Sequence, residues 1–253
     1  MDQSLRDRVA IVTGASNGIG KGIAEAFAAA GAKTVLVART ADKLNSLLGR
    51  LEASGATAMA VPCDVTREGD VARLFAEVCA KFGRVDVVVN NAGVASGTAI
   101  DDLTLDAWND VVSINLTAVF LMCREAVKTM KAQTPQGGRI INMGSVSAKT
   151  PRPDSIAYTA TKHAIQGMTH QLTMDGRKYG VVASIIHPGA TLSSFTSRRG
   201  RTTAGAGATP DDYVMSAADV ARVAVLMATL PPEVNLYEAT ILPNQMRSFI
   251  GRG

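Results

Sequence analysis

The feature that most restricts the fold of this sequence is the alternation of short apolar runs with segments of helical character. The apolar runs predict strands at residues 8–13, 34–38, 57–62, 85–89, 139–143, 181–186 and 238–242. The segments between them predict helices at 21–30, 42–53, 67–82, 105–131, 156–179 and 217–230, with a break near Val112 and Ser113. Near-continuous apolar strands joined by helices predict right-handed crossovers and a doubly wound parallel sheet of about seven strands, with helices on both faces.

Composition agrees with such an α/β core. The chain has 253 residues, of which 47% are hydrophobic and only 4% aromatic, so aliphatic side chains must fill the core. Single α/β domains often reach this length, and neither a linker nor a shift in composition divides the chain. We therefore expect residues 1–253 to form one dinucleotide-binding and catalytic domain.

Charge and cysteine usage indicate the setting and the partners. The net charge of +4 is small and dispersed, which argues against nucleic-acid binding. No apolar run reaches the ~18 residues of a membrane span, and the first residues lack a signal-peptide pattern. Cys63, Cys79 and Cys123 have no metal-ligand spacing. We expect free thiols, a cytoplasmic protein, no metal site and no membrane partner.

Polar or glycine-rich clusters follow six of the predicted strands, at the carboxyl end of each. They occupy residues 13–20, 39–40, 63–65, 90–93, 143–147 and 187–191. In an open parallel sheet, ligands bind at the carboxyl ends of the strands, where the strand order reverses. The coincidence of these clusters predicts a ligand site at this edge without depending on any single motif.

The first cluster has the spacing Gly-x-x-x-Gly-x-Gly, with glycines at 14, 18 and 20. Such glycines let the backbone turn tightly and approach a pyrophosphate. The helix that starts near Gly18 offers free N–H groups and the positive end of its dipole to the same group. A purely structural turn between strand and helix remains the alternative.

Two further side chains bear on nucleotide recognition. Arg39 follows the second strand, where an acidic residue would accept from a ribose 2′-hydroxyl and an Arg suits a 2′-phosphate. Thr40 and Lys43 are candidates to assist it. Asp64 is placed to accept from the adenine amino group. The alternatives are a solvated surface Arg and an Asp that caps the helix beginning at Arg67.

Tyr158 and Lys162 are four residues apart in a predicted helix and therefore share one face. A cationic amine beside a phenol favours the phenolate and lowers its pKa, as a general acid working near neutral pH requires. Ser145 follows the strand at 139–143 and is a candidate to bring a hydroxyl to the same place. A Tyr and a Lys at this spacing also occur by chance as solvated neighbours. The catalytic interpretation of the pair therefore depends on the presence of a nucleotide site in the same chain.

With these residues in hand, the chain resembles the short-chain dehydrogenase/reductase family in its branch of single-domain, Rossmann-type members of about 250 residues. The resemblance covers roughly residues 5 to 245. Its motifs, in family order, are Thr13-Gly14-x-x-x-Gly18-Ile19-Gly20, Asp64-Val65, Asn90-Asn91-Ala92-Gly93, Asn115, Ser145, Tyr158-x-x-x-Lys162 and Pro188-Gly189.

The resemblance implies roles for these residues. Tyr158 would be the catalytic acid/base, and Lys162 would lower its pKa and hold the nicotinamide ribose. Ser145 would hydrogen-bond the substrate oxygen, and Asn115 would hold a water that links Lys162 to solvent. The expected substrate contacts are Ser145, Ser147 and Tyr158. The expected cofactor contacts are Gly14, Ser16, Asn17, Gly18, Ile19, Gly20, Arg39, Thr40, Asp64, Val65, Asn91, Ala92, Gly93, Tyr158, Lys162, Pro188, Gly189 and Thr191.

The implied activity is hydride transfer between NADP(H) and a carbonyl or secondary alcohol, an EC 1.1.1-type reaction on CH–OH groups. NADP(H) is the expected cofactor because of Arg39, although Asn17 stands where NADP-dependent members often have a basic residue, so NAD(H) stays open. The alternatives are an epimerase or dehydratase that retains its cofactor, and a non-catalytic NAD(P)-binding regulator. The segment 230–243 resembles members that act on 3-hydroxy acids.

Three further expectations concern assembly and the substrate side of the site. The family usually forms homotetramers or dimers, and the helices at 105–131 and 156–179 would supply the interfaces unless they only pack in the core. Residues 191–213 lack an apolar period and would form a mobile substrate loop. His187, alone at a strand end, is expected to pack or hydrogen-bond rather than to catalyse.

Overall fold

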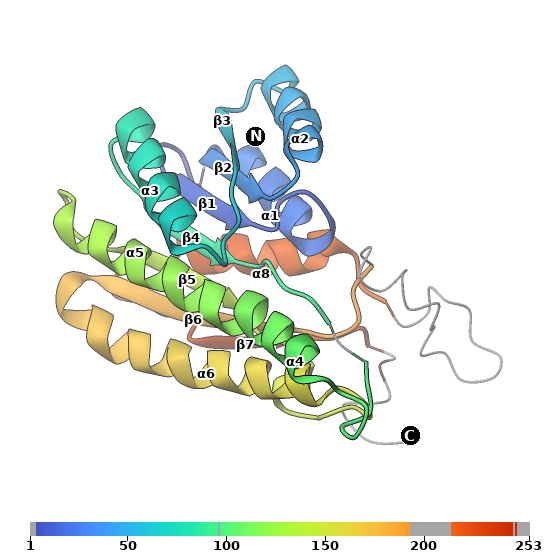
Figure 1. Cartoon of the computed structure of the whole chain (residues 1–253). Helices are drawn as coiled ribbons and strands as arrows, with labels where there is room; N and C mark the ends of the chain where they lie inside the picture. Colours follow the sequence, from blue (N-terminus) through green and yellow to red (C-terminus); the bar gives the residue numbers. More distant parts are fainter. Residues whose placement is uncertain (1–3, 96, 193–213, 245, 247–253) are drawn as a thin grey trace.

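The computed structural model describes residues 4–95, 97–192, 214–244 and 246. Its centre is a seven-stranded parallel sheet in the order β3-β2-β1-β4-β5-β6-β7 (Figure 1). The strands are β1 Val9–Thr13, β2 Lys33–Ala38, β3 Ala58–Pro62, β4 Val87–Asn90, β5 Gly138–Met143, β6 Val181–Pro188 and β7 Glu238–Ile241. The predicted doubly wound parallel sheet is confirmed.

The helices cover both faces of this sheet. They are α1 Gly18–Ala29, α2 Ala41–Ala53, α3 Glu68–Phe82, α4 Leu105–Val112, α5 Ala118–Ala132, α6 Ile156–Gly176 and α8 Ala217–Thr229. Alternate residues of a strand point to opposite faces, so Ala10 and Val12 of β1 join one core cluster and Val9 and Ile11 the other. The first cluster contains α1, α2 and α8, and the second contains α3, α5 and α6 (Figure 1).

The predicted break in the long helical region is a π-helical turn rather than an interruption. Ser113–Thr117 connects α4 directly to α5, and the two run on as one long helix (Figure 1). Such a turn inserts a residue into a helix while the backbone remains hydrogen-bonded, and it is frequent at functional sites. Asn115 lies within the turn and is fully buried.

The strand order reverses between β1 and β4, because β2 and β3 extend the sheet on one side and β4 to β7 on the other. Thr13 ties the two strand ends together at this point. Its hydroxyl donates to the Val89 carbonyl at 3.2 Å and accepts from the amide groups of Asn91 and Ala92, at 2.9 and 3.1 Å. The Asn91 side chain donates back to the Thr13 carbonyl at 3.0 Å.

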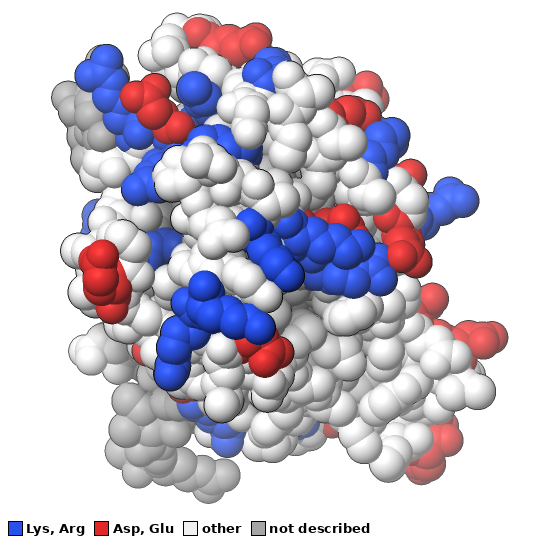
Figure 2. All heavy atoms as spheres, turned by 90° about the vertical axis from the view of Figure 1, so that its left-hand side faces the viewer, with Lys and Arg blue, Asp and Glu red and all other residues white. Residues whose placement is uncertain are grey.

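Asp86 holds the opposite, amino-terminal edge of the sheet together. This carboxylate is buried, accepts from the Val9 amide at 2.9 Å and pairs with Arg84 at 2.9 Å and with Arg8 at 3.4 Å. Figure 2 shows this side of the molecule, where Lys and Arg lie in separate groups among Asp and Glu. Within the described ranges, no helix has the length and apolarity to cross a membrane, and no three potential metal ligands gather.

Replacement of Asp86 tests this anchor. Asp86→Ala leaves the buried Val9 amide without its acceptor and removes the partner of two arginines, so the free energy of unfolding should fall by about 2–3 kcal/mol. Urea denaturation, monitored by circular dichroism, measures this loss in the free energy of unfolding. Glu77→Ala, which breaks an exposed pair with Arg73 at 2.8 Å, is the control and should leave the midpoint in place. Equal midpoints for the two variants would contradict the assignment.

Candidate active site

The glycine turn lies against the segment that follows β4. Gly14 and Gly18 have positive φ angles of 66° and 53°, which suit residues without a side chain. A Cβ on Gly14 would lie 2.8 Å from the side-chain Nδ2 of Asn91 and 3.1 Å from the Ala92 Cα. A Cβ on Gly20 would collide with Asn91 and with the Gly14 carbonyl. Close packing of the turn against Asn91 and Ala92 therefore requires glycine at positions 14 and 20.

Helix α1 begins at this turn. Asn17 is its N-cap, and its side-chain oxygen accepts from the Gly18 amide at 2.7 Å. The first turn of α1 contains no acidic side chain, so no carboxylate of this turn neutralises the positive end of the helix dipole. Ser16 and Ile19 flank the cap in the same turn. A helix start of this kind suits a pyrophosphate.

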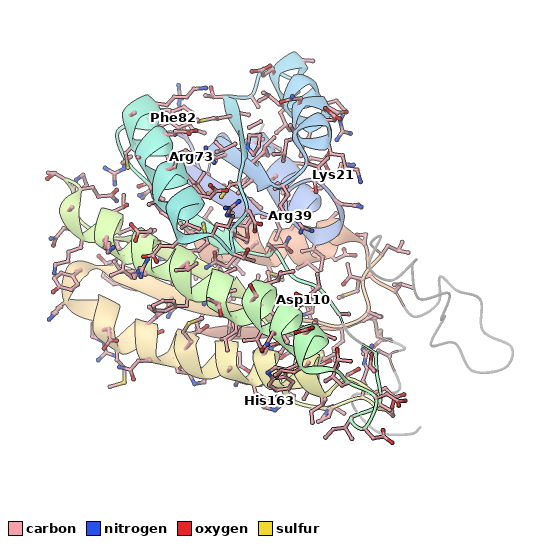
Figure 3. All side chains as sticks on the ribbon, viewed as in Figure 1. Lys21, Arg39, Arg73, Phe82, Asp110 and His163 are labelled. Atoms are coloured by element: carbon pink, nitrogen blue, oxygen red, sulfur yellow. The ribbon has the colours of Figure 1, made fainter. Side chains whose placement is uncertain are left out.

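Arg39 and Thr40 follow β2, and both side chains are exposed (Figure 3 labels Arg39). Arg39 forms no ion pair with any residue in the described part of the chain. Thr40 is the N-cap of α2, yet its hydroxyl makes no capping hydrogen bond. Lys43 is exposed in the first turn of the same helix. Arg39 lies close enough to Asp64 to help lower the pKa of that carboxylate, yet its exposed guanidinium remains accessible to a phosphate.

Asp64 and Val65 follow β3. The Asp64 carboxylate accepts from the Thr66 hydroxyl at 2.7 Å and from its amide at 3.1 Å, and these hydrogen bonds hold its pKa below the usual value. The N-cap of α3 is Arg67, without a side-chain capping bond. The alternative that Asp64 caps this helix is therefore wrong. Its carboxylate closes a local turn instead.

Asn115 clamps the backbone after the Asn91-Ala92-Gly93 segment. Its side chain accepts from the Val94 amide and donates to the Val94 carbonyl, both at 2.8 Å. The same amide group lies 3.4 Å from the Thr161 hydroxyl of α6. A Cβ on Gly93 would lie 3.2 Å from the Asn115 oxygen, which explains the small residue there. The π-helical turn therefore connects the segment after β4 to α6.

Lys162 lies in the centre of these contacts. Its ammonium group is buried and donates to the Met143 carbonyl at 2.8 Å. It also lies 5.5 Å from the centre of the Tyr158 ring. Burial lowers the pKa of Lys162 to about 8, because the charged form loses its hydration. The Lys162 cation, with a pKa close to neutral pH, therefore lies beside the half-buried phenol of Tyr158.

Ser145 and Ser147 belong to the turn that follows β5. Both are buried, and the Ser145 Oγ accepts from the Ser147 amide at 3.1 Å. Because this oxygen is acting as an acceptor, its own proton is available to donate elsewhere. Ser145 lies two residues after Met143, whose carbonyl binds Lys162. The structure thus brings the turn after β5 to the first turns of α6.

The segment after β6 completes the edge. Gly189 donates its amide to the Ile241 carbonyl at 2.8 Å, and a Cβ there would lie 2.8 Å from the Met246 sulfur. The Thr191 hydroxyl donates to the Gly189 carbonyl at 3.0 Å, and Thr191 forms a β-bridge with Met215. Of the predicted substrate loop, residues 193–213 lie outside the described part of the chain.

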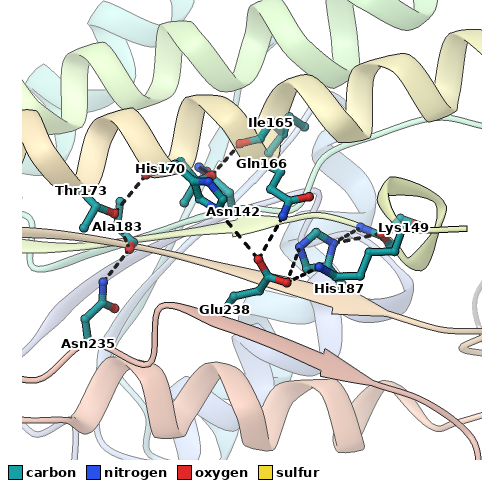
Figure 4. A network of polar contacts seen from close by, with 12 residues as sticks. Asn142, Lys149, Ile165, Gln166, His170, Thr173, Ala183, His187, Asn235 and Glu238 are labelled. Carbon is teal, nitrogen blue, oxygen red and sulfur yellow. Dashed lines mark hydrogen bonds and ion pairs between the residues drawn. The ribbon is translucent and has the colours of Figure 1, made fainter.

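One polar cluster at this edge was not predicted from the sequence. Glu238 of β7 contacts Lys149, which follows the turn containing Ser145 and Ser147, and its carboxylate lies 3.8 Å from the buried ring of His187 (Figure 4). The His187 ring in turn hydrogen-bonds the backbone of Ser145, in agreement with the packing or hydrogen-bonding role expected for it. The only signal in the sequence was a carboxylate at the start of an otherwise apolar strand.

The residues at the edge fit a dinucleotide. The glycine turn packs tightly at the carboxyl end of β1, and the start of α1 favours an anion. The buried amine of Lys162 lies at the carboxyl end of β5, which is the same edge of the sheet because all strands are parallel. An anion site and a buried cation at one edge are groups that a nicotinamide cofactor would need.

Among known sequences, the family described as short chain dehydrogenase matches residues 8–204. A 3beta-hydroxysteroid dehydrogenase of Mediterraneibacter gnavus is 36% identical over 193 residues, which are 76% of this chain and 69% of that protein. A putative ketoacyl reductase of the granaticin polyketide synthase of Streptomyces violaceoruber is 34% identical over 190 residues, 75% of this chain and 70% of that protein.

Solved structures agree with these relatives. A metagenomic short-chain oxidoreductase in complex with NADP is 32% identical, with a TM-score of 0.80, over 94% of this chain and 97% of that one. Actinorhodin polyketide ketoreductase with NADPH is 27% identical, with a TM-score of 0.86, over 97% of this chain and 99% of that one. The chain therefore belongs to the short-chain dehydrogenase/reductase family of oxidoreductases.

Proposed function

We propose that this protein transfers a hydride between NADP(H) and a carbonyl or secondary alcohol, with Tyr158 as the proton donor and acceptor. The observation that carries the proposal is the buried ammonium group of Lys162, held on the Met143 carbonyl and 5.5 Å from the Tyr158 ring. A buried cation beside a phenol stabilises the phenolate, which is the form left after proton delivery.

The other residues of the site hold and orient the reactants. The bound cofactor would supply or accept the hydride. The turn at Gly14, Gly18 and Gly20, with the start of α1, would hold its pyrophosphate. The segment 91–93, with Pro188, Gly189 and Thr191, would flank the nicotinamide half, and Asp64 and Val65 the adenine.

Ser145 is proposed to donate its proton to the oxygen of the substrate, because its Oγ already accepts from the Ser147 amide. The hydroxyl would thereby stabilise negative charge that develops on this oxygen, next to the phenol of Tyr158. Ser147, which follows in the same turn, is the further substrate contact. Asn115 would fix the first turns of α6 through Thr161, in addition to the water-holding role that the family implies.

Arg39 supports the preference for NADP(H). Its guanidinium is exposed at the end of β2, forms no ion pair with a described residue and lies near Thr40 and Lys43. A planar guanidinium binds a phosphate with two parallel hydrogen bonds, whereas it gives no such match to a ribose hydroxyl. The NADP and NADPH complexes of related structures are consistent with this assignment.

The substrate is proposed to be a ketone or a 3-hydroxy acid, or the corresponding alcohol or keto form. The names of the relatives, a hydroxysteroid dehydrogenase and a ketoacyl reductase, point to oxygen on a secondary carbon. Homo-oligomer formation is part of the proposal, as a tetramer or a dimer. It is supported by exposed apolar side chains on α4 to α6, namely Leu105, Phe120, Ile156 and Met174.

Tyr158→Phe tests the assigned acid. The variant removes the proton that is delivered but keeps the ring, so kcat for NADPH-dependent ketone reduction should fall by about 10³-fold or more. The dissociation constant for NADPH, measured by fluorescence titration, should change little. Tyr179→Phe, in the 3₁₀ turn Arg177–Tyr179 that follows α6, is the matched control and should keep full activity. Unchanged turnover in Tyr158→Phe would refute the role.

Arg39→Asp tests the choice of cofactor. The carboxylate would repel a 2′-phosphate and accept from a ribose hydroxyl, so the ratio of kcat/KM with NADPH to kcat/KM with NADH should fall by about 100-fold. Arg222→Asp makes the same change of charge at an exposed site on α8 and should keep the ratio. A wild-type protein that already strongly favours NADH would show the NADP(H) assignment to be wrong.

The pH profile tests the charge on Lys162. Burial lowers the pKa of this amine to about 8, so its cation is lost as the pH rises through that value. In the direction of carbonyl reduction, kcat/KM reports the free enzyme and should be constant near pH 7 and decline above about pH 8. Initial rates between pH 6 and 10, with the folded state checked by circular dichroism, measure the decline. A flat profile across that range would contradict the requirement for a cation.

A further inference from the structure

A partly buried cluster of polar side chains joins β6, β7 and α6 (Figure 4). Its centre is Glu238 at the start of β7. The carboxylate contacts Lys149, accepts from the Gln166 side chain of α6 at 3.1 Å, and lies 3.8 Å from ring nitrogens of both His187 and His170. The cluster therefore connects the last strand of the sheet with β6, with α6 and with the segment after Ser147.

His187 connects this cluster to Ser145. Its ring is completely buried, and Nδ1 lies 2.9 Å from the Ser145 carbonyl oxygen and 3.3 Å from the Ser145 amide nitrogen. The other ring nitrogen, Nε2, faces Glu238 and has no hydrogen-bond partner among the described residues. One edge of the imidazole thus meets the backbone of a site residue, and the opposite edge meets a carboxylate.

Gly144, the residue before Ser145, leaves space for the His187 ring because it has no side chain. A Cβ on Gly144 would lie 2.6 Å from Nδ1 of His187 and 2.7 Å from the adjacent ring carbon. Any larger residue at 144 would push the ring away from the backbone. The Gly144 amide also donates to the Ile186 carbonyl at 2.7 Å, which keeps β5 and β6 paired up to the turn. The absence of a side chain at 144 is therefore matched to the ring.

Nδ1 binds the Ser145 backbone in either neutral form of the ring. With the proton on Nδ1, the ring donates to the carbonyl oxygen at 2.9 Å. With the proton on Nε2, Nδ1 accepts from the amide at 3.3 Å, and the N–H of Nε2 points at the Glu238 carboxylate. Burial lowers the pKa of His187, so the neutral ring is the form that acts near neutral pH.

We propose that His187 is a positioning residue for the reaction, which holds the Ser145 hydroxyl in place through the Ser145 backbone, while Glu238 faces the opposite edge of the ring and pairs with Lys149. This inference rests on the proposed function of Ser145. The turn from Ser145 to Lys149 is then fixed at both ends by one strand pair, at its start by His187 of β6 and at its end by Glu238 of β7.

The physical reason is the short distance between the anchor and the reacting group. Only Cα and Cβ separate the Ser145 Oγ from the anchored backbone. The same oxygen accepts a hydrogen bond from the Ser147 amide. A shift of the peptide group moves the hydroxyl by a similar amount, and a misplacement of about 1 Å can cost on the order of 100-fold in rate. An apolar side chain of similar volume would fill the space but would leave the backbone unanchored.

Three variants separate positioning from packing. His187→Leu fills the space and removes the polar contact, so kcat for NADPH-dependent ketone reduction should fall about 100-fold. His187→Asn keeps an amide near the place of Nδ1 and should recover at least tenfold of that loss. KM and the dissociation constant for NADPH should stay within about threefold of wild type in both variants.

His170→Leu is the matched control. It removes a ring that faces Glu238 from the other side, at 3.8 Å, and that stacks on Tyr237, but it does not remove a contact with Ser145. Its kcat should stay within about twofold of wild type. Wild-type kcat in His187→Leu would overturn the proposal. An equal loss in the Leu and Asn variants, accompanied by loss of NADPH binding, would overturn it as well, because it would indicate a role in folding alone.

A second measurement needs neither substrate nor cofactor. The chain has three histidines, so ¹⁵N-histidine labelling gives three imidazole pairs, and His163→Asn and His170→Asn leave His187 by elimination. A ring held on the Ser145 backbone should show one protonated and one bare nitrogen at pH 7.5. Either tautomer agrees with the proposal, but fast exchange between the two requires water to reach both ring nitrogens. Nitrogen signals averaged by such exchange would therefore show that the ring is not held and would overturn the proposal.

The failure of this inference differs from the failure of the proposed function. If Tyr158→Phe is inactive while His187→Leu is fully active, the site works as proposed and the positioning role is wrong. If the wild-type protein does not turn over NADPH with any ketone of a broad panel, the proposed function itself fails. In that case the NMR measurement alone reports the contact between His187 and Ser145.

Discussion

The reversal of strand order between β1 and β4 is the constraint on which the rest of this structure depends. At such a point, successive connections leave the sheet in opposite directions, and ligands bind outside the carboxyl ends of the two strands. Thr13 and Asn91 hydrogen-bond across the reversal and bring the glycine turn against the segment after β4. Because all seven strands are parallel, each of the other polar segments reaches the same edge.

A buried ammonium group organises the second half of that edge. Burial of a charge is unfavourable unless polar groups compensate for the lost water, and the Met143 carbonyl does so for Lys162. Behind it, the Asn90 side chain donates to Asn142, which donates to Thr169 of α6, both at 2.9 Å. These bonds fix α6 against β4 and β5, so the helix that carries Tyr158 cannot shift without leaving buried polar groups unpaired.

The sequence predicted the architecture well because each buried strand is a continuous apolar run followed by glycine or polar residues. Strand and helix ends differ by a few residues at most, as at β6, which extends to Pro188. Contacts between distant segments were not predictable from local pattern. The approach of His187 to Ser145 depends on the pairing of β5 with β6 and on the missing side chain at Gly144. The partner of Asp64 was missed because a helix cap and an isolated turn have the same local sequence signal.

The π-helical turn at Ser113–Thr117 has a consequence for how this chain can vary in length. Each residue of a regular helix advances the direction of the side chains by about 100°, at 3.6 residues per turn. Because the turn accommodates one residue more than a regular helix, deletion of a single residue within it would make the helix regular and leave the buried face of α5 against the sheet. The side chains of the turn would change direction, so Asn115 would lose its hydrogen bonds with the Val94 backbone. The fold should therefore tolerate a one-residue deletion here while the site does not, whereas the same deletion inside α4 or α5 would rotate part of the helix against the sheet.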